Sequence, residues 1–120
     1  MLYPELSSTI IDAVFAVNRA LGPGLLEALY HNALFYELKA SGVPVEYNVG
    51  YTVFHRGQSV GEYFADLVAA NKVIIEVKAV SALAAVHQAQ LLNYLRISGL
   101  RLGFLITFGG IKATWKRLVV

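Results

Sequence analysis

The stretch NKVIIEVKAV, residues 71–80, has the pattern of a buried strand but carries two charged side chains near its end. Glu76 and Lys78 are separated only by Val77. Charged side chains are rarely buried unless they are paired or bind a metal ion. Because side chains alternate along a strand, Glu76 and Lys78 share one face, and Ile75 and Val77 share the other. The stretch therefore predicts a strand with one apolar face, while the other face presents the charged side chains of Glu76 and Lys78 to a possible site.

A third charged residue, Asp66, precedes this strand in ADL. Directly opposite residues of an antiparallel hairpin point to the same side of the sheet. Asp66 and Glu76 are opposite if the pairing is centred on Asn71. This register corresponds to a three-residue turn in which Asn71 or Lys72 adopts the left-handed conformation. A shift by one residue would place Asp66 on the other face, so we predict an even register or a bulge that restores one.

Two carboxylates and a lysine on one face can hold a metal ion and act on a phosphate ester. Carboxylates a few ångströms apart repel each other, and a divalent cation relieves this repulsion. Mg²⁺ takes one or two protein carboxylates together with water and phosphate oxygens, and a bound metal ion lowers the pKa of its water. Lys78 could position or deprotonate that water, or neutralise developing charge. The alternative is a solvated salt bridge at a sheet edge, but the position of Glu76 inside VIIEV disfavours it, because exposed strands alternate polar and apolar residues.

Helical periodicity dominates the first third of the chain. Apolar residues three or four apart over 6–21 predict an amphipathic helix, with Ser7 or Ser8 as its N-cap. GPG at 22–24 ends this helix, and a second one is predicted over about 25–40. Four leucines of the second helix are expected to face the core: Leu26, Leu29, Leu34 and Leu38.

Strand periodicity dominates the remainder. Five strands are predicted, over residues 45–54, 59–69, 72–79, 100–108 and 112–120. A helix over about 82–98, capped by Ser81 and ended by Gly99, connects the third strand to the fourth. The fourth strand is apolar enough to be buried on both faces, and the fifth is basic and expected at an edge. The order predicts one α/β domain, residues 1–120, with helices on both faces of a mixed sheet that contains a parallel pair.

The composition fits such a domain with a binding partner. Of 120 residues, 57% are hydrophobic, against an average of about 45–50%, so apolar surface is expected to remain for a partner. The formal net charge of +2 permits a polyanionic partner without requiring one. No apolar run approaches the roughly 18 residues of a membrane span, no signal peptide is visible, and there is no cysteine. We therefore expect a cytoplasmic protein without membrane contact.

Short motifs follow one another in a recognisable order. GLLEALY contains Gly24, Glu27 and Tyr30, ADL and EVK contain the charged residues described above, and HQAQLLNYL contains Gln90 and Tyr94. With these motifs the sequence resembles the PD-(D/E)XK nuclease superfamily and, more narrowly, its small bacterial GxxExxY proteins. The resemblance covers about residues 5–110. Ala65 stands where the family has the proline of its Pro-Asp pair, and that proline ligates nothing.

The resemblance implies a restriction-endonuclease-like αβββαβ core with Mg²⁺ or Mn²⁺ at the centre of the sheet. The implied metal ligands are Asp66, Glu76 and, from the second helix, Glu27. Lys78 and Gln90 complete the expected catalytic set. Three further residues are candidates for binding: Tyr94, Tyr30 and His87.

Each helical candidate also has a structural interpretation. Glu27, in the first turn of its helix, could act as a partner of the helix dipole. Tyr30 and Tyr94 could pack in the core. Gln90 could cap a strand end, and His87 could be an ordinary hydrogen-bonded or exposed residue.

The sequence thus predicts a metal-dependent nuclease that hydrolyses phosphodiester bonds in DNA, for repair, processing or defence. The alternative is a non-catalytic nucleic-acid-binding or assembly module, since a fold alone does not establish activity. Because a chain of 120 residues has no room for a separate recognition domain, we expect a homodimer or a larger assembly.

Overall fold

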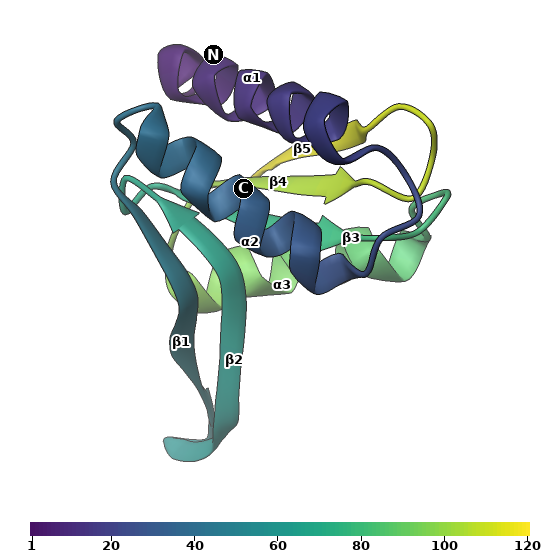
Figure 1. The fold of residues 1–120 in the computed structure, drawn as a ribbon. Helices are drawn as coiled ribbons and strands as arrows, with labels where there is room; N and C mark the ends of the chain where they lie inside the picture. The colour runs from purple at the N-terminus through teal and green to yellow at the C-terminus, as the bar shows by residue number, and fades with distance from the viewer.

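The computed structural model describes residues 1–120 as three helices and a five-stranded sheet (Figure 1). The elements are α1 (Pro4–Leu21), α2 (Glu27–Ala40), β1 (Val45–His55), β2 (Gln58–Ala69), β3 (Val73–Lys78), α3 (Ala85–Ser98), β4 (Leu102–Thr107) and β5 (Thr114–Val119). The strands lie in sequence order, with β3 parallel to β4 and the other neighbours antiparallel. The predicted mixed α/β sheet is confirmed, as are the fully buried fourth strand and the basic edge strand.

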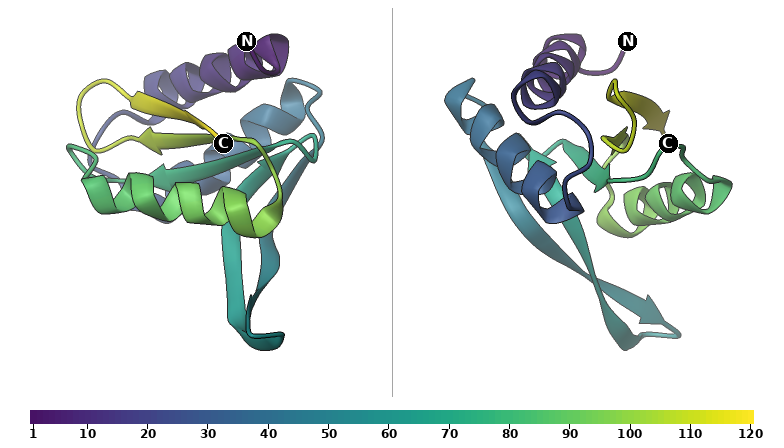
Figure 2. Two further views of the ribbon diagram at one scale, coloured as in Figure 1. Left: turned by 180° about the vertical axis from the view of Figure 1, so that it is seen from behind. Right: turned by 45° about the vertical axis from the view of Figure 1, so that its right-hand side comes forward.

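The helices cover both faces of the sheet, as predicted (Figure 2). On one face, α1 and α2 pack over a core of 17 buried residues that includes Val14, Leu34 and Ile75. On the other face, α3 packs over six buried residues, among them Leu91. No helix is long and apolar enough to cross a membrane. Because β3 is covered on both sides, a charged side chain on it is largely withdrawn from water.

The first helix begins earlier than predicted. It starts at Pro4, which has the backbone φ that a helix needs and no N–H group to leave unpaired. Ser7 and Ser8 therefore lie inside α1, and neither is its N-cap. Ser7 is buried against the core, with the helix residues Ile10 and Val14 on the same face.

The second helix directs fewer leucines into the core than predicted. Leu34 and Leu38 are fully buried, but Leu26 is 76% and Leu29 is 47% exposed. Tyr30 takes the inward position of the first turn, at an interval of four residues from Leu34. Because an interval of four keeps residues on one helix face, Tyr30 and the inner leucines align, and Leu29 is turned outward.

The third helix begins later than predicted. It starts at Ala85 with Ala84 as N-cap, so Ser81 is not the cap. The Thr107 hydroxyl donates a hydrogen bond to the Val80 carbonyl, which fixes the chain beside β4 before the helix starts. The end of the helix is as predicted, because Gly99 adopts the left-handed conformation that suits glycine.

The turn between β2 and β3 has the predicted centre. Leu67 pairs with Ile75 and Ala69 with Val73, which is a register centred on residue 71. Continued by one residue, this register places Asp66 opposite Glu76. The left-handed residues are Ala70 and Asn71, so the predicted left-handed residue, Asn71 or Lys72, is Asn71.

The β1–β2 hairpin projects beyond the body of the molecule as a long arm (Figure 1). β2 pairs with β3 only over Leu67–Ala69, whereas it pairs with β1 along nearly its whole length. The molecule is accordingly elongated, with extents of 46 × 28 × 24 Å. The separation of β2 from β3 begins at Asp66.

The two strands of the hairpin exchange faces at this point. On β2, Leu67 belongs to the core beneath α1 and α2, whereas Ala65 belongs to the core beneath α3. In a regular strand these two residues would share a face. On β1 the residue facing Asp66 in the register is Asn48, which has a left-handed φ of 50°. The distortion turns the outer hairpin, including Tyr63, toward the α3 side of the sheet.

Candidate functional site

Asp66 is held in place at the break in β2 by two other elements. Its backbone carbonyl lies 2.7 Å from Nε2 of His31 on α2. Since a carbonyl only accepts, His31 carries its proton on Nε2 and donates it. The Asp66 carboxylate accepts the Val77 N–H through Oδ2 at 2.7 Å, in place of a backbone carbonyl of the departing strand. Asp66 is thus fixed by α2 through its backbone and by β3 through its side chain.

Glu76 is a nearly buried carboxyl group in the middle of the site. It is 6% exposed, and the Tyr63 hydroxyl donates a hydrogen bond to its Oε1. Burial, followed by the charge of Asp66, raises the pKa of Glu76 to about 8, while the Tyr63 hydrogen bond and the charge of Lys78 act in the lowering direction. With no cation present, Glu76 is therefore mainly protonated at pH 7, and Asp66 is close enough to repel its charge.

Lys78 is the last residue of β3 and is half-buried. By strand alternation it shares a face with Glu76, and its charge favours the ionised form of that carboxyl group. It pairs in register with Thr107 at the end of the parallel strand β4. The carboxyl ends of adjacent parallel strands are a common place for ligand sites.

Tyr94 reaches the same region from α3. Its ring stacks on that of Tyr63, with an angle of 12° between the ring planes. Burial raises the pKa of Tyr94, and the charges of Glu76 and Asp66 raise it further, which places its hydroxyl within their electrostatic reach. Gln90 lies one turn earlier on α3 and is exposed to solvent.

Glu27 lies on α2, on the face of the sheet opposite to α3, and its side chain reaches the end of β3. It is the first residue of α2, and its Oε1 accepts the Ala79 N–H at 3.4 Å, one residue beyond Lys78. The structure thus brings Glu27 to the end of β3. It does not bring Glu27 into a common group with Asp66 and Glu76, since no three His, Cys, Asp or Glu side chains lie close enough together to hold a metal ion.

Tyr30 is placed in the core and away from the site. It lies on the inner face of α2 and is fully buried, with its ring stacked on that of Phe108 at 4.6 Å between ring centres. Its hydroxyl donates to the Gly22 carbonyl at 2.6 Å and accepts the Leu25 N–H at 3.1 Å. These contacts hold the loop between α1 and α2, and they leave Tyr30 no surface with which to touch a substrate.

His87 serves the start of α3. Its Nδ1 accepts the N–H of the N-cap residue Ala84 at 3.1 Å, which is the contact that the residue at helix position N3 makes back to the N-cap in a capping box. Because Nδ1 accepts, the free proton of a neutral ring is on Nε2. The structure therefore supports the local hydrogen-bonding interpretation of His87.

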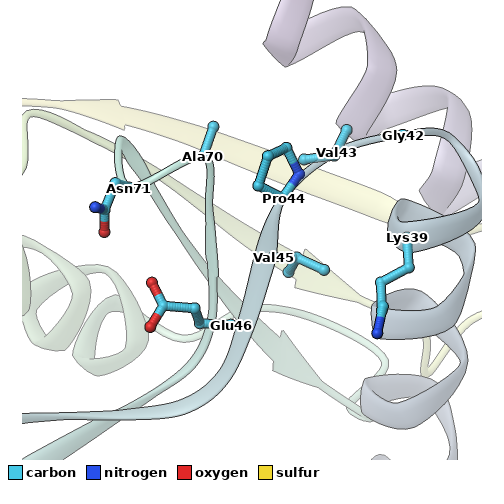
Figure 3. A pocket seen from close by; sticks show the side chains of 8 residues that line it. All are labelled: Lys39, Gly42, Val43, Pro44, Val45, Glu46, Ala70 and Asn71. Atoms are coloured by element: carbon cyan, nitrogen blue, oxygen red, sulfur yellow. The ribbon is translucent and has the colours of Figure 1, made fainter.

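The widest surface hollow is not at the carboxylates. It lies between the end of α2, the start of β1 and the β2–β3 turn (Figure 3). Lys39 borders it on one side, and Glu46 and Asn71 on the other. None of the charged residues of the predicted site lines it.

The donor set at Asp66 and Glu76 fits a hard divalent cation. Both side chains supply carboxylate oxygens, the ligand type that Mg²⁺ and Mn²⁺ prefer. The observation that supports the fit is a buried carboxyl group beside a second one: burial and then the charge of Asp66 raise the pKa of Glu76, and a bound cation would favour the ionised form of Glu76. Asp66 and Glu76 would hold the ion, and water and phosphate oxygens would complete its coordination.

Two residues of the site were not anticipated from the sequence. Tyr63 contacts Glu76, although strand alternation places it on the face opposite Asp66. His31 supports Asp66 from a helix 35 residues away in the chain. The adjacency of His31 to Tyr30 in the GLLEALY motif was the available signal for the second residue, and the tyrosines Tyr51 and Tyr63 on paired strands were the signal for the first.

Comparison with known proteins agrees with the fold. A family model of the PD-(D/E)XK nuclease superfamily matches residues 4–118. The chain therefore belongs to the PD-(D/E)XK nuclease superfamily, whose members generally use divalent metal ions.

Similarity to individual proteins is more limited. No curated protein matches the chain. A solved structure titled "Crystal structure of SSO0001" matches with a TM-score of 0.61 and 22% sequence identity. The match covers 98% of this chain and 59% of that one. At this identity the similarity shows a shared fold.

Proposed function

We propose that this protein is a Mg²⁺- or Mn²⁺-dependent nuclease that hydrolyses phosphodiester bonds in DNA. The observation that carries the proposal is the pair of carboxyl groups at the β2–β3 separation, Asp66 and Glu76, followed on the same strand by Lys78. A nearly buried carboxyl group beside a second carboxylate is costly unless it has a functional partner. The proposal assigns it a metal ion and a phosphate ester as partners.

The residues would divide the work as follows. A bound divalent ion supplies Lewis acidity toward a phosphate oxygen and a water of lowered pKa. Asp66 presents the carboxylate oxygen that Val77 leaves free, and Glu76 presents the oxygen that Tyr63 leaves free. Lys78 holds a proton at Nζ, where it can position a water molecule or neutralise developing phosphate charge.

Three helix residues have supporting roles in this assignment. Glu27, at the end of β3, would act through the water shell of the ion, because it is not grouped with the other two carboxylates. Gln90 is exposed beside the site on α3 and would contact the nucleic acid strand. Tyr94 would support it from the stack on Tyr63.

The narrower GxxExxY grouping is part of the proposal. Its support is the motif GLLEALY, in which each named residue has a distinct position here. Gly24 has a positive φ of 94°, Glu27 starts α2, and Tyr30 holds the loop in front of it. The motif therefore acts as a unit that brings Glu27 to the end of β3.

Cleavage assays test the proposal directly. Single-stranded DNA, duplex DNA and RNA would be incubated with the protein and Mn²⁺, beside Glu76→Gln and Lys78→Met. Glu62→Gln, on the outer hairpin, is the matched control because Glu62 is an exposed carboxylate of β2. We expect Mn²⁺-dependent cleavage that both site variants abolish and the control retains. Cleavage that survives both site substitutions would contradict the assignment.

The alternative is a non-catalytic nucleic-acid-binding or assembly module, and one observation favours it. Glu76 is 6% exposed and already engaged by Tyr63, which is an arrangement that a closed, metal-free site would have. Calorimetry with Mn²⁺ separates the two functions. A saturable signal that Asp66→Asn removes supports the nuclease, and DNA binding without any such signal supports the module.

We also propose that the protein acts in the cytoplasm as a homodimer or larger assembly. The support is the outer hairpin, which exposes large apolar side chains: Phe54, Val60 and Phe64. Sedimentation equilibrium of the wild type and of Phe64→Ser tests this. We expect an assembly larger than the monomer for the wild type only.

A further inference from the structure

Tyr63 contacts the candidate site, although it belongs to none of the nuclease motifs in the sequence. It lies on β2 three residues before Asp66, and the exchange of strand faces turns it to the α3 side. There its ring is enclosed between Tyr51 of β1 and Tyr94 of α3, with the Tyr51 ring centre 6.4 Å away. Three elements thus fix the orientation of one phenol ring.

The hydroxyl of this ring has one protein partner, Oε1 of Glu76. In this contact the Tyr63 hydroxyl donates and Oε1 of Glu76 accepts. A donated hydrogen bond fixes which carboxyl oxygen is engaged and therefore how the carboxyl plane is turned.

We propose that Tyr63 is a positioning residue that holds Glu76 in the orientation that binds the divalent ion. This inference rests on the proposed function, because it concerns the same site. Tyr63 touches neither the ion nor the reacting phosphate in this proposal and acts only through Glu76. Hydrogen-bond partners of metal ligands commonly change metal affinity by about 10- to 100-fold when they are removed.

Tyr63→Phe is the informative variant, since it deletes the hydroxyl and retains the ring that stacks on Tyr94. Tyr51→Phe is the matched control, because Tyr51 belongs to the same stack and makes no contact with Glu76. Mn²⁺ binding would be measured by calorimetry on the wild type and both variants. We expect the Kd to rise about tenfold in Tyr63→Phe and to stay within about twofold in Tyr51→Phe.

A second readout guards against a merely structural effect. Co²⁺ bound in place of Mn²⁺ has visible absorption bands that depend on ligand geometry, and we expect these bands to change in Tyr63→Phe alone. Thermal unfolding of each variant reports whether it is folded. A Tyr63→Phe variant that is unfolded at the assay temperature would be replaced by Tyr63→Met, which fills part of the ring volume and has no hydrogen-bond donor.

The outcomes separate this inference from the proposed function. Wild-type Mn²⁺ binding with an unchanged Kd in Tyr63→Phe would overturn the role of Tyr63 and leave the nuclease proposal intact. The absence of saturable Mn²⁺ binding in the wild type would overturn both. Equal losses in Tyr63→Phe and Tyr51→Phe would assign the effect to the stack and would also overturn the positioning role.

Discussion

Nε2 of His31 on α2 lies 2.7 Å from the backbone carbonyl of Asp66 on β2 and donates its proton to it. This contact takes the place of a strand-to-strand hydrogen bond at the point where the outer hairpin turns away from β3. The His31 ring is itself held by stacking on Tyr47 of β1 at 4.3 Å. A helix side chain thus stabilises the break in the sheet that presents Asp66.

His31→Ala should destabilise the fold, because it leaves a partly buried carbonyl without its donor. We expect a loss of about 1–3 kcal/mol in the free energy of unfolding, measured by urea titration. His55→Ala is the control, since His55 is exposed near the hairpin tip and should change stability by less than about 0.5 kcal/mol. Equal effects of the two substitutions would show that the His31 contact does not stabilise the break.

Glu76 should make the stability of the metal-free protein depend on pH. Its pKa is raised from 4.5 to about 8 in the folded state, so the folded protein holds a proton that the unfolded chain releases. The corresponding stability is fully present below pH 4.5 and is lost as the pH rises toward 8. At about 1.4 kcal/mol per pKa unit, the full loss is of the order of 5 kcal/mol.

Urea unfolding in EDTA between pH 5 and 8.5 measures this dependence. Glu76→Gln, which is neutral at every pH, should remove most of the decline, whereas Glu62→Gln on the outer hairpin should retain it. A wild-type curve without any decline over this range would mean that Glu76 ionises normally in the folded protein.

Tyr30→Phe should affect stability and leave the metal site unchanged. The substitution removes the hydroxyl that bridges Gly22 and Leu25, and we expect a loss of about 1–2 kcal/mol in the free energy of unfolding. Tyr36→Phe is the control because Tyr36 is 68% exposed. Calorimetry should give the same Mn²⁺ affinity for wild type and Tyr30→Phe. A large loss of affinity would instead place Tyr30 in the binding machinery.

Gly109→Ala should be among the most damaging small substitutions in the chain. An added Cβ would lie 2.0 Å from backbone atoms of Val80, which cannot move aside as a flexible side chain would. We expect a loss of about 3 kcal/mol or more, read from thermal unfolding. Gly110→Ala is the adjacent control, since its nearest neighbour would be 3.7 Å away. Similar melting temperatures for the two variants would contradict the close approach.

Local patterns in the amino-acid sequence are sufficient to predict part of the fold and part of the site. The alternation in VIIEVK predicted a strand with Glu76 and Lys78 on one face, and the turn chemistry around Asn71 predicted the register that sets Asp66 opposite Glu76. The order of helices and strands predicted the mixed sheet and its parallel pair. These predictions succeed because each depends on neighbours within a few residues or on a fixed repeat.

The tertiary structure alone decided which side chains surround the carboxylates. Side chains alternate between the two faces of a strand only while the backbone stays extended. This alternation fails opposite Asp66, where the backbone of Asn48 is left-handed. That exchange of faces brings Tyr63 to Glu76. The break is stabilised by a hydrogen bond from His31, on a helix distant in the sequence. Because tertiary packing places this donor, no repeating pattern in the sequence predicts the contact.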